Sequence, residues 1–244
     1  MMKKIGIIAA ALTVALTTVP VQAKVTADEA AKLGTELTPL GGEKAGNADG
    51  SIPAWTGGIT SAPAGYSAGD FHPDPYAGEK PEFVITAANY QQYADQLSEG
   101  LKKMFETYPD TFKLPVYKTH RSASNPQFVY DATKENATRA TLLDDGNGMA
   151  GAAVGIPFPI PANGLEAIWN HIARYRGPAV QRNGGQAAVT AGGDYNVIGF
   201  DEQLLIQYSQ ENATPESLLE NNVLFMFKQK VTKPARMAGT ALLV

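Results

Sequence analysis

The chain has 244 residues, a formal net charge of −4 and no cysteine. Without cysteine it carries no disulfide, iron–sulfur cluster, cysteine–zinc site or catalytic thiol, and it lacks the lipidated cysteine of a lipoprotein. An acidic chain without a block of basic residues is a poor partner for nucleic acid, so we expect no such partner.

The first 23 residues have the pattern of a cleavable secretory signal peptide. Lys3 and Lys4 give a positive start, and the run 5–19 that follows carries no charge. This run is shorter than the ~20 residues that a membrane-spanning helix needs. Small residues precede a cleavage point between Ala23 and Lys24, as secretory signals require. We therefore expect a chain that is secreted to the periplasm. The short apolar run and the cleavage point disfavour an uncleaved membrane anchor.

Residues 24–85 are predicted to form a short helix followed by an irregular segment. Thr26 and Glu29 have the spacing of a capping box that starts the helix. The stretch 38–82 is rich in glycine and proline, so neither a long helix nor an inner strand is expected there. It also carries scattered aromatic residues, which disordered linkers rarely contain. We expect this stretch to be ordered and to lie along the domain.

Residues 86–244 are predicted to form a second unit, in which helices come before strands. Apolar residues at three- and four-residue steps predict helices over 86–108, 126–139 and 164–176. Between the last two helices, glycines predict a flexible loop over 144–155. The apolar period then changes to two, which predicts strands over 179–191, 195–208, 221–232 and 235–244. This order is typical of an α+β fold with an antiparallel sheet.

No catalytic residue, cofactor or metal is predicted. The Gly-x-Ser-x-Gly pattern of serine hydrolases occurs once, at 65–69, but it falls in the glycine- and proline-rich stretch 38–82, where the strand-to-helix turn that such a hydrolase needs is not expected. Asp70, His72 and Asp74 are close in sequence, but their spacing suits no standard zinc site and a turn explains them better. The segment 47–50 is similar to part of a calcium loop but lacks the bidentate Glu at the proper place, so a turn is expected there too.

Five motifs occur in order along the chain. They are LTPLGGEKAGN at 37–47, DGSIPAWTGG at 49–58, YKTHR at 117–121, IPFPIP at 156–161 and GLEAIWNH at 164–171. Together they resemble the bacterial family called domain of unknown function 1329, whose members are similar to the periplasmic carriers of lipoproteins, LolA and LolB. The resemblance implies a curved antiparallel sheet, an incomplete half-barrel packed on helices, whose apolar inner face holds an acyl chain. Family members are often longer, and the apolar last strand also leads us to expect a chain that continues beyond Val244.

We therefore predict a non-enzymatic periplasmic carrier that moves a hydrophobic molecule, a lipid or a lipoprotein acyl chain, toward the outer membrane. If helix 164–176 packs on the sheet, the apolar pocket is formed by Leu165, Trp169, Ile172, Phe225 and Phe227. Without the resemblance, an ordinary hydrophobic core explains these residues better than a ligand pocket does. Two alternatives stay open: an accessory subunit of an envelope export system that binds no lipid, and a hydrolase of a hydrophobic ester. An envelope transporter or outer-membrane protein is the expected protein partner. Peripheral association of the chain with the outer membrane is left open.

Overall fold

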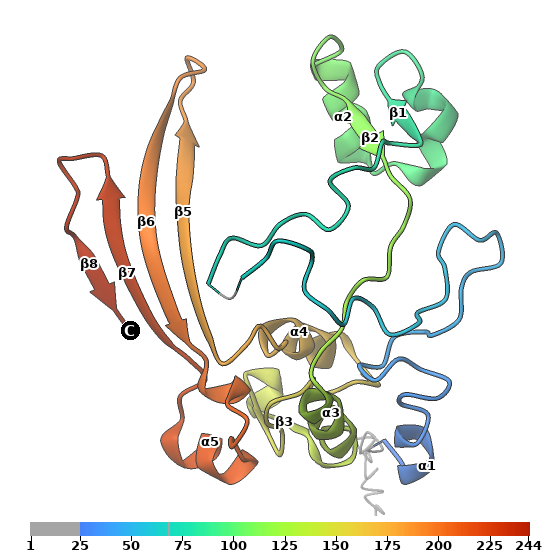
Figure 1. Ribbon diagram of the computed structural model, residues 1–244, viewed down its shortest axis with the longest axis vertical. Coiled ribbons are helices and arrows are strands. Elements are labelled where there is room, and N and C mark those ends of the chain that lie inside the picture. The colour runs from blue at the N-terminus through green and yellow to red at the C-terminus, as the bar shows by residue number, and fades with distance from the viewer. Residues whose placement is uncertain (1–24, 68) are drawn as a thin grey trace, which may run out of the picture.

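The computed structural model describes residues 25–67 and 69–244 (Figure 1). Its α-helices are α1 Ala27–Ala30, α2 Glu99–Thr107, α3 Gln127–Arg139, α4 Gly164–Ile172 and α5 Pro215–Asn221, with 3-10 helices η1 Tyr90–Gln96, η2 Asp144–Gly146 and η3 Gln207–Ser209. Its strands are β1 Phe83–Ile85, β2 Leu114–Val116, β3 Thr141–Leu143, β4 Gly148–Ala150, β5 Ala179–Val189, β6 Tyr195–Leu205, β7 Met226–Lys233 and β8 Ala241–Leu243. The predicted signal peptide, with its cleavage point at Ala23 and Lys24, lies outside the described residues.

Strands β5 to β8 form one antiparallel sheet in the order of the sequence. The register of β5 and β6 runs from Ala179 opposite Leu205 to Val189 opposite Tyr195. Figure 1 shows this sheet as a curved wall that rises from a base containing α3, α4 and α5. Within the described residues, β5 and β8 are the outer strands and do not pair with each other, so this sheet is not closed. The predicted α+β class with an antiparallel sheet is confirmed.

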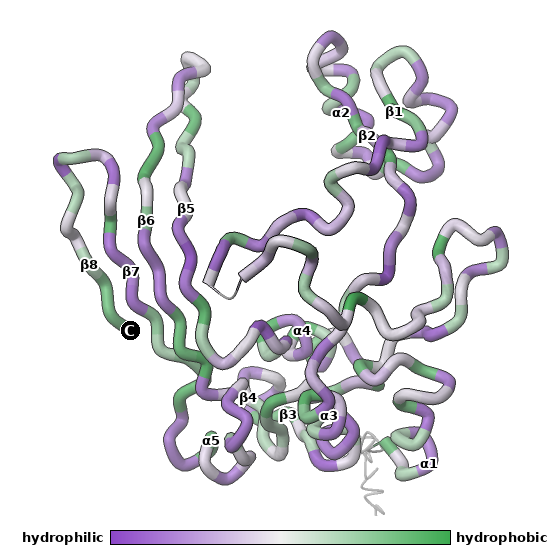
Figure 2. Tube along the Cα trace, viewed as in Figure 1, coloured by the Kyte–Doolittle hydropathy of each residue, from purple (hydrophilic) through white to green (hydrophobic). Residues whose placement is uncertain are grey.

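One face of the sheet, which we call the inner face, combines apolar residues with one paired carboxylate. Its cross-strand pairs include Phe200 with Val231 and Leu204 with Phe227. Between them lies buried Glu202, which accepts hydrogen bonds from Arg182 and, at 2.6 Å, from Gln229. Figure 2 shows apolar residues gathered at the base of β5 and β6 and polar residues at mid-height. The base of this face is therefore suited to apolar contacts, and the paired carboxylate separates it from the apolar residues higher on the sheet.

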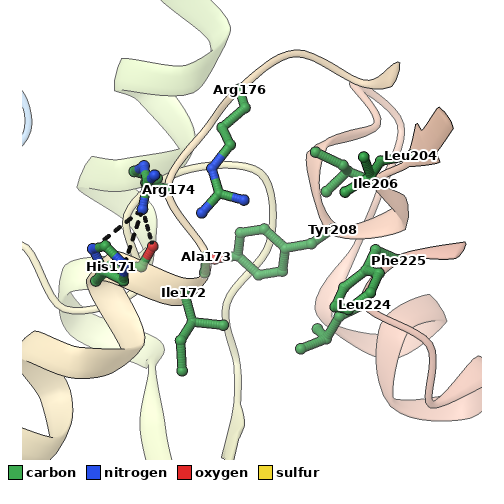
Figure 3. Close-up of a pocket in the computed structure, with 10 residues that line it drawn as sticks. All are labelled: His171, Ile172, Ala173, Arg174, Arg176, Leu204, Ile206, Tyr208, Leu224 and Phe225. Carbon is green, nitrogen blue, oxygen red and sulfur yellow. Dashed lines mark hydrogen bonds between the residues drawn. The ribbon is translucent and has the colours of Figure 1, made fainter. Parts of the chain in front are cut away.

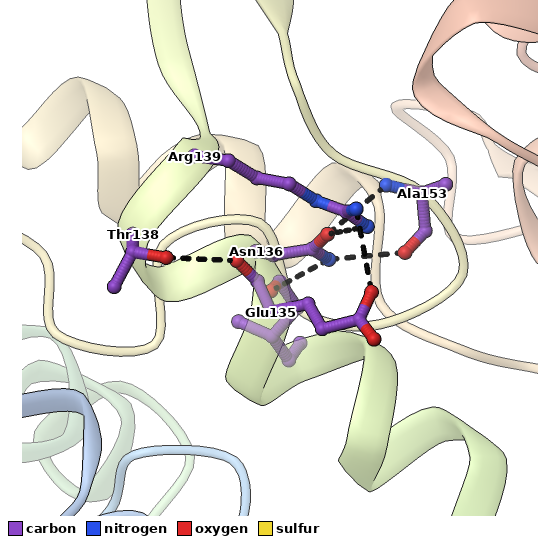
Figure 4. Close-up of polar contacts among 6 residues, drawn as sticks. Glu135, Asn136, Thr138, Arg139 and Ala153 are labelled. Carbon is purple, nitrogen blue, oxygen red and sulfur yellow. Dashed lines mark hydrogen bonds and ion pairs between the residues drawn. The ribbon is translucent and has the colours of Figure 1, made fainter. Parts of the chain in front are cut away.

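The base is held together by Asn136 on α3, which is fully buried (Figure 4). Its amide donates to the carbonyl oxygens of Ala153 and Ile156 at 3.0 and 3.3 Å. Its carbonyl oxygen accepts the Ala153 N–H at 3.3 Å and an Arg139 guanidinium N–H at 3.1 Å. Every polar atom of the Asn136 side chain is thus paired, as burial requires. These bonds fasten the chain that follows β4 to α3.

The predicted loop over 144–155 is contradicted in part. Residues 148–150 form strand β4, which pairs with β3, while Ala153 and Val154 lie outside helices and strands and pack against α3. Gly155 shows how close this packing is, because a Cβ there would lie 2.4 Å from the Thr133 hydroxyl and 2.7 Å from the Val129 carbonyl oxygen. Glycine serves here for close approach to a helix.

The predicted helix over 86–108 is also interrupted. It divides into η1 and α2 at Leu97, which is extended, and Ser98, whose side chain accepts from the Leu101 N–H and starts α2. Ile85, Leu97 and Phe105 form a small core of their own with β1 and β2. Figure 1 shows this small unit standing apart from the base. The Ser98 cap therefore starts a new helix, although apolar residues recur at helical steps through the whole segment.

Distant residues bind the backbone and side chains of the irregular segment 38–82 near its start. The Arg121 guanidinium donates to carbonyl oxygens of Glu43, Lys44, Ala45 and Pro53. The Trp55 indole donates to the Ala123 carbonyl oxygen at 3.0 Å. The capping box of Thr26 and Glu29 is also confirmed. No helix in the described part of the chain is long and apolar enough to cross a membrane.

Candidate ligand-binding site

A cavity of about 290 Å³ lies where the C-terminal end of α4 meets the base of the sheet (Figure 3). Its apolar wall comes from three places in the chain: the end of α4, the end of β6 and the approach to β7. These contribute Ile172, Leu204, Ile206, Leu224 and Phe225. The cavity has about the size of the smallest ligand pockets in proteins. It can hold a slender apolar group.

Local sequence signals place α4 at this cavity. The Asn163 side chain starts the helix by accepting from the Glu166 N–H at 3.0 Å. The Asn170 side chain accepts from the Phe158 N–H at 2.8 Å and donates to the Phe158 carbonyl oxygen at 2.6 Å. One residue earlier, the Trp169 indole donates to the Gly146 carbonyl oxygen at 2.9 Å. These bonds fix the rotation of α4 and so the direction of Ile172.

Tyr208 forms a rigid part of the cavity wall. Its side chain is almost fully buried, and its hydroxyl donates to the Gly155 carbonyl oxygen at 2.7 Å. Its backbone N–H donates to the Leu224 carbonyl oxygen at 3.1 Å. Burial raises the pKa of the Tyr208 phenol far above its usual value, so this side chain is neutral at physiological pH. The part of the wall that Tyr208 forms therefore carries no charge.

Basic side chains stand at the rim of the cavity. Arg174 donates to the His171 carbonyl oxygen at 3.0 Å and also contacts the His171 ring. Arg176 follows two residues later and also lines the cavity. Among the described residues, no carboxylate lies within 4.0 Å of either guanidinium. The site thus joins an apolar wall to uncompensated positive charge.

An apolar stripe on α4 leads to the cavity. Leu165, Ile168 and Ile172 share one side of the helix and keep 49%, 58% and 45% of their surface exposed. The sequence predicted a pocket that includes Leu165 and Ile172 if this helix packed on the sheet, whereas the structure leaves about half of each stripe side chain in contact with solvent. Ile172 belongs both to the stripe and to the cavity wall. Stripe and cavity therefore form one apolar surface.

The structure brings together two of the five predicted pocket residues, Ile172 and Phe225. Trp169 lines a separate cavity of about 300 Å³, with Tyr208 and Leu224 in the wall between the two. Phe227 lines a third hollow on the sheet. Leu165 lies over Gly146, where a Cβ would approach its side chain to 2.5 Å.

Sequence reasoning missed the Arg pair, Tyr208, Leu224 and His171. The structure puts His171 at the cavity rim. The one signal in the sequence was two arginines directly after a helix with an apolar stripe. Tyr208 and Leu224 gave no comparable signal, because only the folded chain brings them to α4.

The acidic residues around His72 form turns, as predicted. The Ser67 N–H donates to Asp70 at 3.3 Å, and the Tyr76 N–H donates to Asp74 at 2.8 Å. In the segment 47–50, the Asn47 side chain accepts the Ile52 N–H at 2.8 Å and likewise closes a turn. Within the part of the chain that the structure describes, no group of three His, Asp or Glu residues is arranged to hold a metal ion.

Comparison with known proteins gives a family but no activity. A family model described as a protein of unknown function (DUF1329) matches residues 84–244. The uncharacterized protein PA3922 of Pseudomonas aeruginosa is 51% identical over 233 residues, which cover 96% of this chain and 51% of that protein. The chain thus spans about half the length of this curated relative. No solved structure matches the chain.

Proposed function

We propose that this chain, which belongs to the DUF1329 family of proteins of unknown function, is a non-enzymatic periplasmic carrier of a hydrophobic molecule. The molecule would be a lipid or a lipoprotein acyl chain on its way to the outer membrane. The observation that carries the proposal is the cavity at the end of α4, together with the exposed apolar stripe that leads into it. The signal-peptide pattern at the start of the sequence supports the periplasmic location.

Burial of the exposed apolar surface favours the binding of a hydrophobic ligand here. Fully burying an aliphatic side chain contributes roughly 1.5–3 kcal/mol, and the stripe residues Leu165, Ile168 and Ile172 forgo about half of this by remaining exposed. An acyl chain laid along the stripe and into the cavity recovers that free energy and adds ~0.8 kcal/mol for each methylene removed from water. Contiguous apolar surface of this kind typically marks a binding site.

The architecture supports the same proposal. An open, curved antiparallel sheet over helices is the arrangement expected for a LolA/LolB-like half-barrel. The cavity lies between the base of the sheet and α4, where such a half-barrel would hold its guest. In this proposal the carrier would pass its ligand to or from an envelope transporter or an outer-membrane protein.

Lipid extraction tests the proposal. The chain is secreted to the periplasm of a Gram-negative host, purified without detergent, extracted with organic solvent and examined by mass spectrometry. We expect a bound lipid in the wild type and its loss in Ile172→Asn. The matched control is Ile52→Asn, because Ile52 is a surface isoleucine that is 46% exposed, against 45% for Ile172, and does not line the cavity.

Two results would contradict the carrier. One is wild-type protein that contains no lipid and forms a stable complex with an envelope protein, which would favour the accessory subunit. The other is steady turnover of a hydrophobic ester, which would favour the hydrolase. Equal lipid content in Ile172→Asn and Ile52→Asn would show that the ligand lies elsewhere on the protein.

A further inference from the structure

We infer that the ligand of this cavity is an anionic amphiphile, with a single apolar chain against the cavity wall and a carboxylate or phosphate headgroup bound by Arg176 at the rim. The inference rests on the proposed function, because it names the chemical class of the ligand for the same cavity. Two observations carry it: the position of Arg176 and the shape of the apolar wall.

Among the arginines of the described chain, Arg176 combines an unpaired guanidinium with a place in the cavity wall. Within that part of the chain Arg236 is unpaired as well, but it does not line the cavity. Arg139 and Arg182 have carboxylate partners, Arg121 binds backbone carbonyls, and Arg174 binds the end of α4. Within the described residues, the Arg176 guanidinium has neither a carboxylate within 4.0 Å nor a hydrogen-bond partner. Figure 3 shows its side chain reaching from the chain after α4 toward the Tyr208 ring. An unpaired cation that lines an apolar cavity is suited to an anion from outside.

The surrounding charges strengthen the attraction for an anion. Burial, and then the neighbouring positive charges of Arg174 and Arg182, lower the pKa of Arg176 from its usual value. An anion beside Arg176 would relieve this repulsion. Arg174 already donates to the His171 carbonyl oxygen at the negative end of the helix dipole. We therefore give it only a supporting role in binding the anion. Arg176 therefore provides the main contact.

The rest of the cavity selects the tail. Ile172, Leu204 and Phe225 present apolar side chains next to the guanidinium, and Tyr208 offers no charge. A small inorganic anion would leave this wall uncovered, while an uncharged lipid would leave the guanidinium without a partner. A guanidinium binds carboxylate and phosphate through paired, charge-assisted hydrogen bonds. A molecule with both parts satisfies both surfaces.

Calorimetric titration with a matched set of probes tests the inference. The probes are dodecyl phosphate, the uncharged glycerol monoester of dodecanoic acid, dodecyltrimethylammonium and inorganic phosphate, each below the concentration at which it forms micelles. We expect dodecyl phosphate to bind at least about tenfold more tightly than the uncharged ester, as one charge-assisted hydrogen bond implies. Arg176→Gln should abolish this preference, because dodecyl phosphate loses more affinity than the uncharged ester.

Two further variants separate charge from packing. Arg176→Lys keeps the positive charge and should retain part of the preference. Arg236→Gln removes an arginine in the turn between β7 and β8, away from the cavity, and should behave as the wild type. Urea unfolding of each variant checks that it is folded.

The outcomes distinguish this inference from the proposed function. Equal affinity for dodecyl phosphate and the uncharged ester would overturn the anionic headgroup and leave the carrier intact. A preference for dodecyltrimethylammonium would overturn it as well. Inorganic phosphate that binds as tightly as dodecyl phosphate would indicate an anion site without a tail. Failure of every dodecyl probe to bind would refute the carrier itself.

Discussion

Removing the Phe225 side chain should weaken ligand binding in addition to weakening the fold. Phe225 lines the cavity and keeps 51% of its surface exposed, so a bound chain can cover it. A phenylalanine side chain buries 150–250 Å² when fully enclosed, which leaves about 100 Å² for the ligand to cover. At about 25 cal/mol per Å², this contact contributes about 2.5 kcal/mol to binding.

Phe225→Ala should therefore raise the dissociation constant for dodecyl phosphate between about tenfold and sixtyfold, the upper figure applying if the chain covers the whole exposed area. Calorimetric titration measures the constant, and urea unfolding measures the stability of the free protein. The matched control is Tyr108→Ala, because Tyr108 is an aromatic residue with the same 51% exposure on the small unit of α2.

The two variants should lose similar amounts of stability, because each side chain is about half covered by the protein. Only Phe225→Ala should lose affinity. If both variants bind as the wild type does, the cavity is not the ligand site and the reasoning is wrong. If both lose affinity equally, the loss reflects the fold and not the contact.

Three further predictions concern the fold and the processing of the chain. Asn136→Ala should lower the free energy of unfolding by about 2–3 kcal/mol in urea, because it leaves the buried N–H of Ala153 unpaired; a change below about 0.5 kcal/mol would contradict the role given to Asn136. The hydrogen bond from Arg182 lowers the pKa of Glu202 in the folded state, so its contribution to stability is present above the unfolded pKa of about 4.5 and is lost as pH falls through the folded pKa. The stability difference between wild type and Glu202→Gln should accordingly shrink as urea titrations move from pH 7 to pH 3, and a difference independent of pH would rule this out. Protein recovered from the periplasm should begin at Lys24 by mass spectrometry, and an intact Met1 would exclude cleavage.

The elements that the sequence predicted well are those defined by local signals. α3 begins and ends within one residue of its prediction, and α4 begins after its cap, Asn163. β5 and β6 begin at the predicted residues 179 and 195, because an alternating pattern is visible in one strand alone. Local signals were also overlooked: Ser98 starts α2, and Thr214 with Ser217 forms the capping box of α5, a helix that was not predicted.

The site was harder to predict, because it depends on which elements meet. Ile172 and Phe225 could be proposed from apolar periodicity, but periodicity alone does not separate the residues that face a cavity from those that fill a core. Trp169 faces a different cavity because its indole is held by a carbonyl oxygen in the distant β3–β4 turn. Tyr208 and Arg176 meet only after the end of α4 is placed against β6. No local sequence pattern predicts the contact between the end of α4 and β6.

Photo-cross-linking with a fatty acid that carries a diazirine near its terminal methyl group tests the central claim most directly. After irradiation and proteolysis, the labelled residues are located by mass spectrometry. We expect the label on the segments 171–176, 204–208 and 224–225, which surround the cavity, and its competition by dodecyl phosphate. Labelling spread evenly over the protein, or concentrated on the tip of the sheet, would contradict binding at the end of α4.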